Sequence, residues 1–341
     1  MRWEQQTVEH EAGARLPGYR DVTVRHFDAP EAVDTRFYEV EAKSILNQVP
    51  PSSQMPFRWT INPYRGCTHA CCYCFARPTH EYLDLNAGRD FEREIVVKVN
   101  APELLRAELR RPRWAHEHVA LGTNTDPYQW VEGRYELMRG IWEALRDARN
   151  PCSVLTKSPL LLRDLDLMRE LDAVTDFSAA LSIPTLDQAA WRASEPRSPN
   201  PRARLEALAD LTSAGIRAGV LIAPLMPGIN DSPEQVREIV REATAAGADY
   251  ITGIALHLRR GVREVFMEWL AEYRPELLPR YEQLYRRGAY MAADERRRLA
   301  QLLHGPSRSA RERSGRRWGS SARAASPVRR EIPEPAQRTL F

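Results

Sequence analysis

The sequence predicts an α/β fold, specifically a partial (β/α)6 barrel, from three observations. Six short segments rich in strand-forming residues alternate with helix-length segments, as in right-handed βαβ units with a parallel sheet. The 341 residues, 43% of them hydrophobic, are enough for one large domain with a sizeable core. Polar side chains gather after the strands, where parallel sheets bind ligands. Six strands are too few to close an eight-stranded barrel, so we expect an open one.

The expected strands and helices follow from residue types and from the turn and capping residues between them. Strands are expected at residues 57–62, 118–121, 153–156, 177–182, 219–223 and 250–255, with a separate short strand at 95–99. Helices are expected at residues 102–110, 133–148, 160–171, in the segment ending at 212, and at 233–246 and 261–272. Asp231 and Ser232 precede Pro233 and provide the N-cap of one of these helices.

Composition divides the chain into four regions. Residues 1–55 lack sustained periodicity, so we expect a partly ordered lead-in with packing points at 37–40 and 44–46. Residues 56–275 form the barrel core, and residues 276–304 form a C-terminal helical extension. Residues 305–341 are expected to be disordered.

The charge is concentrated in the tail. The formal net charge is +3, whereas residues 305–341 contain nine Arg and three Glu and therefore carry +6, which leaves −3 for the rest. Such a tail can bind DNA phosphates, although a solvated tail without a partner is an equally open alternative. The last five residues, from Gln337 to Phe341, resemble the Q-x-x-L-F peptides that dock on bacterial sliding clamps. This resemblance implies a clamp partner.

No feature indicates a membrane protein. No segment approaches the run of about 18 apolar residues that spans a bilayer, and the first residues lack an apolar signal region. We expect a cytoplasmic protein, in which thiols stay reduced.

Four of the five cysteines lie in one loop, at residues 65–75. Cys67, Cys71 and Cys74 have the spacing C-x3-C-x2-C. Three thiolates can bind one metal centre and leave one coordination position open, as in a [4Fe-4S] cluster with three protein-bound irons. These three residues are the predicted metal ligands and the centre of the predicted catalytic site.

A structural zinc site is the alternative for this loop. Its fourth ligand would be His69, Cys72 or His80. Zinc sites usually pair two cysteine knuckles, and the sequence has one. Cys72 lies outside the spacing and is interpreted as a bystander, and Cys152 as a buried core thiol.

The cysteine spacing, with the aromatic Tyr73 before the last cysteine, resembles the signature of the radical S-adenosylmethionine (radical SAM) enzymes. The resemblance implies that S-adenosylmethionine binds the open iron of a [4Fe-4S] cluster. An electron from the cluster then cleaves the sulfonium to a 5′-deoxyadenosyl radical, which takes a hydrogen atom from the substrate. It also implies an electron donor of the flavodoxin or ferredoxin type.

Further motifs resemble the spore photoproduct lyase-related, DNA repair photolyase-like radical SAM proteins. They lie at residues 62–67, 122–129, 156–158, 195–196 and 223–231. The resemblance implies contacts to S-adenosylmethionine from Tyr73, Thr125, Asp126, Lys157, Ser182 and Ala223. Lys157 would neutralise the methionyl carboxylate, Ser182 would bond the ribose or carboxylate, and Ala223 would leave room for adenine.

One departure bears on the substrate. Spore photoproduct lyases carry a hydrogen-donating cysteine at the end of the second barrel strand, where this sequence has Thr123. A hydroxyl is a far poorer hydrogen-atom donor than a thiol, so we do not expect repair of the same thymine dimer by the same route. Tyr64, Tyr73 and Tyr128 are alternative relays or packing residues.

Two function hypotheses remain. The first is a lyase-like radical SAM enzyme acting on an unidentified substrate, with damaged DNA as the leading candidate and peptide, RNA or small molecules left open. The second is a non-catalytic, metal-containing protein that binds nucleic acid or the sliding clamp. A pair formed by Glu195 and Arg204 is predicted either as a buried support of the rim or as a surface salt bridge.

Overall fold

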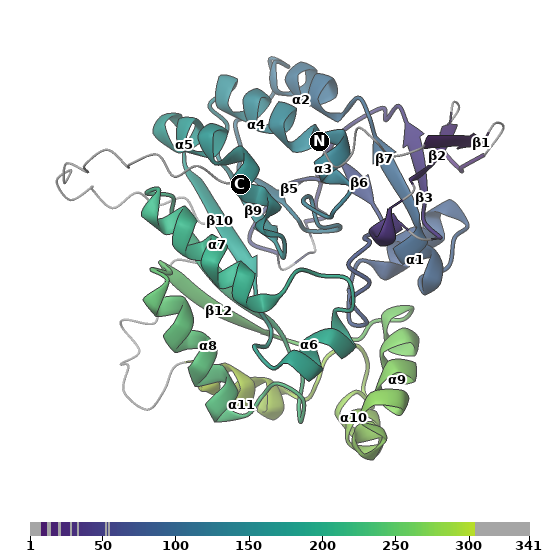
Figure 1. Cartoon of the computed structure of the whole chain (residues 1–341), viewed down its shortest axis with the longest axis vertical. Coiled ribbons are helices and arrows are strands. Elements are labelled where there is room, and N and C mark those ends of the chain that lie inside the picture. Colours follow the sequence, from purple (N-terminus) through teal and green to yellow (C-terminus); the bar gives the residue numbers. More distant parts are fainter. Residues whose placement is uncertain are drawn as a thin grey trace.

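The computed structural model describes residues 8–11, 15–19, 22–27, 29–32, 34–51, 53 and 55–303. These residues form two β-sheets with helices packed around them (Figure 1). The predicted α/β class is therefore confirmed. The Arg-rich tail and the segment from Gln337 to Phe341 lie outside the described residues.

The larger sheet is the predicted partial barrel. Its strand order is β12-β11-β10-β9-β8-β5-β4. Six consecutive strands pair in parallel, namely β5 (Trp59–Ile61), β8 (Val119–Leu121), β9 (Cys152–Thr156), β10 (Phe177–Ser182), β11 (Ala218–Leu225) and β12 (Tyr250–Ala255). Each lies within two residues of a predicted strand. An antiparallel strand, β4 (Leu46–Gln48), pairs with β5 and ends the sheet.

The central strands of the sheet are buried on both faces. Every residue of β10 is buried, including the small pair Ala179 and Ala180. Helix α4 (Leu137–Asp147) buries Trp142, whose ring packs edge-on against Phe177 at the start of β10. Parallel strands covered on both sides are expected to be almost continuously apolar.

The helices follow the prediction with two refinements. The barrel helices are α2 (Ala101–Leu109), α5 (Leu165–Val174), α6 (Gln188–Ser194), α7 (Pro201–Ser213), α8 (Pro233–Ala245) and α9 (Val262–Tyr273). The helix predicted at 133–148 is divided into α3 (Glu132–Tyr135) and α4, because Glu136 has a φ of 50°. The 3-10 helix η3 (Pro159–Asp164) precedes α5. The predicted N-cap of α8 is confirmed, since Gln235 N donates to Ser232 Oγ at 3.2 Å.

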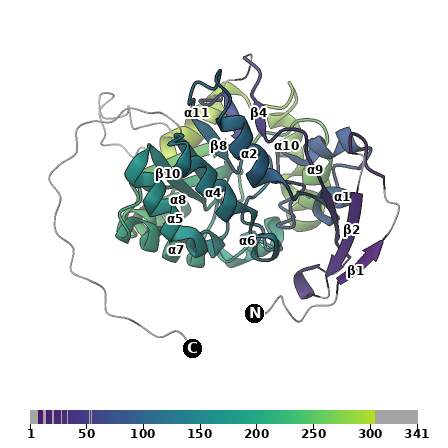
Figure 2. The same ribbon diagram turned by 90° about the horizontal axis from the view of Figure 1, so that it is seen from above.

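The second sheet contains the separate short strand predicted at 95–99, which is β7 (Glu94–Lys98), but the sheet as a whole was not predicted. Its order is β1-β2-β3-β7-β6, formed by β7 together with β1 (Val8–Glu11), β2 (Val22–Phe27), β3 (Arg36–Val40) and β6 (Tyr64–Arg65). It lies on the side of the molecule away from α5, α7 and α8 (Figures 1 and 2). Local periodicity misses it because β3 pairs with β7, which is more than 50 residues further along the chain.

The packing points predicted in the first 55 residues are confirmed. Phe37, Tyr38 and Val40 on β3 and Ile45 before β4 are all buried. They anchor this part of the chain to both sheets.

The C-terminal described segment is helical. It contains η4 (Pro275–Leu277), α10 (Leu278–Leu284) and α11 (Ala293–Leu302). None of the helices in the described ranges is both long and apolar enough to cross a membrane.

Candidate active site

The cysteine loop follows β6 and leads into the 3-10 helix η2 (Arg77–Leu83). It begins at Gly66, which has a φ of +84°. A Cβ on Gly66 would lie 2.9 Å from His80 Cε1, Ile95 Cδ1 and Phe91 O, so no larger residue fits. The loop therefore starts with a turn that only glycine permits.

The three predicted ligands share one electrostatic environment. Cys67 and Cys71 are buried, and Cys74 is partly exposed. Burial raises the pKa of the Cys67 thiol, and the charges of Asp126, Cys71 and Cys74 raise it further. Burial and the charge of Glu195 raise the pKa of Cys71 to about 12, although Lys157 opposes this. Burial and mutual repulsion oppose the loss of protons from these thiols, and a bound metal centre would favour it. Three such cysteines therefore fit the [4Fe-4S] cluster that their spacing predicts.

Arg77 fixes the backbone of the loop. Its side chain is completely buried, and its Nε and Nη2 donate to Cys71 O at 3.0 and 2.8 Å. Its Nη1 donates to Gly88 O at 2.9 Å, and it pairs with Glu92. A buried guanidinium on this carbonyl holds the middle cysteine in place. Sequence reasoning missed Arg77, because only tertiary contacts distinguish it from a surface arginine.

The two histidines proposed as fourth ligands for zinc each contact another protein group through one ring nitrogen. His80 Nε2 lies 2.8 Å from the backbone oxygen of Glu94, and His69 Nδ1 lies 3.4 Å from Asp126 Oδ2. The thiol of Cys72 is buried. Across the described ranges, no group of three or more His, Cys, Asp and Glu residues is placed to hold a single metal ion. Cys152 is buried in β9, as predicted.

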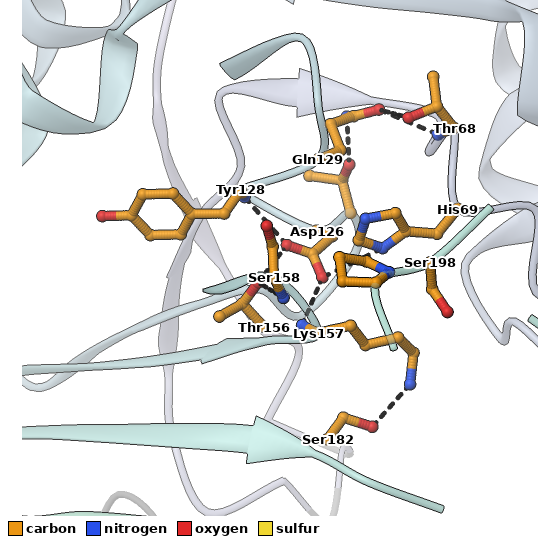
Figure 3. Close-up of polar contacts among 12 residues, drawn as sticks. Thr68, His69, Asp126, Tyr128, Gln129, Thr156, Lys157, Ser158, Ser182 and Ser198 are labelled. Carbon is orange, nitrogen blue, oxygen red and sulfur yellow. Dashed lines mark hydrogen bonds and ion pairs between the residues drawn. The ribbon is translucent and has the colours of Figure 1, made fainter. Parts of the chain in front are cut away.

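Asp126 joins three segments of the rim (Figure 3). Its Oδ1 accepts from Thr156 Oγ1 at 2.5 Å, and its Oδ2 accepts from Lys157 N at 2.8 Å. It also faces His69 in the cysteine loop. Burial alone would raise the pKa of Asp126, but the charge and hydrogen bonds of its partners hold it below its usual value. The carboxylate is thus ionised and satisfied by protein groups.

Thr125 and Gln129 attach the same loop to the start of the cysteine loop. Thr125 Oγ1 donates to Gly66 O at 2.6 Å. Gln129 Oε1 accepts from Thr68 N at 3.0 Å, a contact drawn in Figure 3. The loop after β8 therefore positions the loop after β6.

A polar chain links the ends of β9, β10 and β11. Lys157 Nζ donates to Ser182 Oγ at 2.7 Å (Figure 3), and Ser182 Oγ lies 3.3 Å from Ala223 O. Three of the predicted contacts to S-adenosylmethionine are thus neighbours. Because an ammonium has three N–H donors, Lys157 keeps one beyond its contacts with Ser182 and Glu195.

Glu195 is the buried centre of this rim. Its Oε1 lies 3.0 Å from Lys157 Nζ, and it also pairs with Arg204 and accepts from Tyr73 Oη. Glu195 and Arg204 are both fully buried, which confirms the buried pair and excludes the surface salt bridge. Burial alone would raise the pKa of Glu195, but the charges of Arg204 and Lys157 hold it well below its usual value.

The remaining tyrosines bond to buried carboxylates. Tyr64 Oη donates to Glu132, and Tyr128 Oη donates to Asp164 Oδ2 at 2.9 Å. Burial raises the pKa of Glu132 to about 7 even though Tyr64 bonds to it. Thr123 lies partly buried in the loop after β8 and adds no thiol there.

Comparison with known proteins identifies the relatives of the chain. The sequence pattern of the Radical SAM superfamily matches residues 61–243. The uncharacterized protein Mb2609c of Mycobacterium bovis is 44% identical over 346 residues, covering all of both chains. The uncharacterized protein MJ0683 of Methanocaldococcus jannaschii is 29% identical over 193 residues, covering 57% of this chain and 69% of the relative.

Solved structures with a similar fold include spore photoproduct lyase. Its complex with dinucleoside spore photoproduct superposes with a TM-score of 0.59 at 15% identity, covering 79% of this chain and 77% of the lyase. A mutant lyase with bound AdoMet and dinucleoside spore photoproduct gives a TM-score of 0.58 at 16% identity, covering 78% and 76%. The superfamily match spans more than half of the chain, and the matched region contains the three cysteines. The chain therefore belongs to the radical SAM superfamily.

Proposed function

We propose that this radical SAM enzyme holds a [4Fe-4S] cluster on Cys67, Cys71 and Cys74 and binds S-adenosylmethionine along the ends of β9, β10 and β11. The observation that carries this proposal is the position of Lys157. Its charge acts on Cys71, and its ammonium contacts Ser182 and Glu195. The predicted cluster ligands and the predicted cofactor contacts thus meet at one lysine.

The bound cluster would supply the electron that cleaves S-adenosylmethionine, and the protein supplies position and charge. The remaining N–H of Lys157 would bond the methionyl carboxylate, while Glu195 keeps the ammonium in place. Ser182 lies within hydrogen-bond distance of Ala223 O, so the two residues form one wall suited to the ribose and adenine. Burial of the thiols keeps water away from this region.

Two of the predicted cofactor contacts receive a different role. Both Asp126 oxygens and the Thr125 hydroxyl bond to protein groups. We therefore assign them to positioning of the cysteine loop. Tyr73 donates to Glu195, and its ring centroid lies 5.6 Å from Lys157 Nζ. The ring thus helps to position the ammonium through a cation–π contact.

For the substrate we propose a nucleic acid, with damaged DNA as the first candidate. The support is the fold shared with spore photoproduct lyase, which has been solved with dinucleoside spore photoproduct. By resemblance, Thr123 falls near the place of the donor cysteine in spore photoproduct lyases, so we propose a different hydrogen-return step. We also propose a cytoplasmic location and a flavodoxin-type or ferredoxin-type reductant.

The test is anaerobic. The protein is reconstituted with iron and sulfide, reduced with dithionite and given S-adenosylmethionine, and 5′-deoxyadenosine is measured. We expect product from the wild type and from Cys152→Ala, and none from Cys67→Ala. Equal product from Cys67→Ala would contradict the ligand assignment. Stoichiometric zinc in place of iron, with no product, would overturn the enzyme proposal.

The substrate is tested separately. Ultraviolet-irradiated and untreated oligonucleotides are added to the active enzyme, and repaired or altered bases are measured by mass spectrometry. A change confined to the irradiated oligonucleotide supports damaged DNA. No change in either oligonucleotide, with 5′-deoxyadenosine still formed, directs the search to RNA, peptides or small molecules.

A further inference from the structure

A pocket separate from the cysteine loop is lined by residues of both sheets. It has a volume of about 290 Å³. Its walls come from the segment before β4, from β6, from the end of β7 and from η2. The volume is near the lower limit of the about 300–1,000 Å³ typical of small-molecule sites.

The pocket is strongly positive. Lys43, Arg65 and Lys98 line it, and the lining contributed by the described residues includes no Asp or Glu. The three cations come from three separate segments, so the fold gathers them from distant parts of the sequence. Like charges repel, so such a grouping costs free energy unless an anion lies between them.

Lys98 is the most buried of the three cations. Its side chain is only 7% exposed, and its Nζ donates to Asn62 O at 2.8 Å. Two of its three N–H donors remain for other partners. Burial, together with the charge of Arg65, lowers the pKa of Lys98 to about 8. Buried ammonium groups are normally paired with an anion.

One carboxylate, that of Glu108, acts on Lys98 without an ion pair to it. Its Oε2 accepts from Leu46 N at 2.8 Å and from Ile45 N at 3.2 Å. In the part of the chain that the structure describes, no acidic group lies within ion-pair distance of Lys98 or Arg65. Among the described residues these two cations therefore have donors left for an anionic ligand.

Contacts of Lys98 and the position of Arg65 connect the pocket to the segment before the cysteine loop. Arg65 immediately precedes Gly66, and Lys98 N donates to Pro63 O at 3.0 Å. Lys98 Nζ bonds the backbone of Asn62, whose side chain accepts from Asn124 N at 3.1 Å. A ligand in this pocket would thus lie beside the active site, against an exposed aromatic ring, Tyr82.

We propose that the pocket formed by Lys43, Arg65 and Lys98 binds a phosphate group. A phosphate accepts several charge-assisted hydrogen bonds and suits a guanidinium beside two ammonium groups. The phosphate can belong to a nucleic-acid backbone or to a free phosphorylated small molecule. Binding at this pocket does not require the radical chemistry, so it can be tested without reconstituting the cluster.

The experiment measures binding to the full chain by isothermal titration calorimetry. The probes are inorganic pyrophosphate, thymidine monophosphate and a single-stranded oligothymidylate of eight nucleotides. The variants are Lys98→Gln and Lys43→Glu. Arg241→Gln is the matched control, because Arg241 is an exposed arginine on α8 that pairs with Glu242. All variants keep the Arg-rich tail, so binding to the tail is the same in each.

We expect the affinity for pyrophosphate to fall about tenfold or more in Lys98→Gln, because a charge-assisted hydrogen bond is lost. Lys43→Glu lies at an exposed position, so it tests the pocket even if Lys98→Gln does not fold. It should weaken binding severalfold, and Arg241→Gln should not. Affinities equal to wild type in both pocket variants, or no saturable binding of any probe, would overturn the proposal.

The three probes also distinguish the source of the phosphate. Pocket-dependent binding that is tighter for the oligothymidylate than for the mononucleotide indicates a nucleic-acid backbone. Pocket-dependent binding of equal strength indicates a phosphorylated small molecule. Either result supports the phosphate site.

Discussion

Lys157 Nζ lies 3.0 Å from Glu195 Oε1, and this buried pair connects the end of β9 to the segment between α6 and α7. Glu195 also pairs with the fully buried Arg204, so one carboxylate is shared by two cations. The arrangement leaves net positive charge beside the cysteine loop. It therefore suits an anionic cofactor group next to the thiols.

Glu195→Gln should destabilise the protein strongly. The substitution keeps the shape but leaves two buried cations without their carboxylate, and breaking a buried pair costs about 3–5 kcal/mol. Urea unfolding of wild type and variant at the same pH measures the difference. The exposed pair of Glu234 and Arg237 provides the control, since Glu234→Gln should cost less than about 1 kcal/mol. Similar losses in the two variants would argue against a special role for burial.

Lys157→Gln should weaken binding of S-adenosylmethionine while the protein still folds. Arg204 remains to pair with Glu195, so the carboxylate stays compensated. Loss of one charge-assisted hydrogen bond predicts an affinity about ten- to hundredfold lower. Equilibrium dialysis of S-adenosylmethionine against the reconstituted protein measures this, with Arg241→Gln as control. An unchanged dissociation constant would remove Lys157 from the cofactor site.

Gly122→Ala tests the turn at the end of β8. Gly122 has a φ of +82°, and an added Cβ would lie 1.8 Å from Leu155 O. Gly215 has a φ of +84° with no heavy atom within 4 Å of the same position. We expect a loss of about 3 kcal/mol for Gly122→Ala, because backbone must move, and of about 1–2 kcal/mol for Gly215→Ala. Thermal unfolding of both variants separates the clash from the strain of the backbone angle.

His118 should make the stability depend on pH. Burial lowers the pKa of His118 from 6.5 to about 4. Its Nε2 lies 2.9 Å from Ser153 Oγ. Between these pH values the unfolded chain binds a proton that the folded chain does not. The contribution of His118 to the free energy of unfolding is therefore fully present above pH 6.5. As the pH falls toward 4, the free energy of unfolding decreases by about 2–3 kcal/mol.

The variant His118→Gln should remove this contribution. Unfolding free energies measured at pH 7 and pH 4 should differ less in the variant than in the wild type, by about 2–3 kcal/mol. Identical pH dependences would mean that His118 titrates normally in the folded protein. Other buried histidines, such as His80, are present in both proteins and cancel in the comparison.

Local sequence was sufficient to predict the barrel, and it also suggested the cysteine ligands. The strand segments are short, apolar runs bounded by turn residues, and their alternation with helices specifies a parallel sheet before any contact is known. The C-x3-C-x2-C spacing likewise lies within one loop. The second sheet was not predicted as a unit, because β3 joins its chain neighbour β2 to β7, and β7 comes from beyond the cysteine loop.

The roles of individual rim residues required the tertiary structure. Asp126 and Lys157 both follow strands and look equivalent in the sequence, yet the carboxylate is fully used by protein groups and the ammonium is not. Arg77 and Lys98 read as ordinary surface cations, and the fold buries both.

Spacing along the chain predicted the superfamily and the alternation of strands and helices, which are both confirmed. The three cysteine ligands stay a prediction of the same spacing. The burial and pairing of charges, and the meeting of Lys43, Arg65 and Lys98 in one pocket, follow from the folded arrangement. Burial and charge pairing depend on neighbours that are distant in sequence. The free energy of an ionised group is set by those neighbours rather than by its position in the chain.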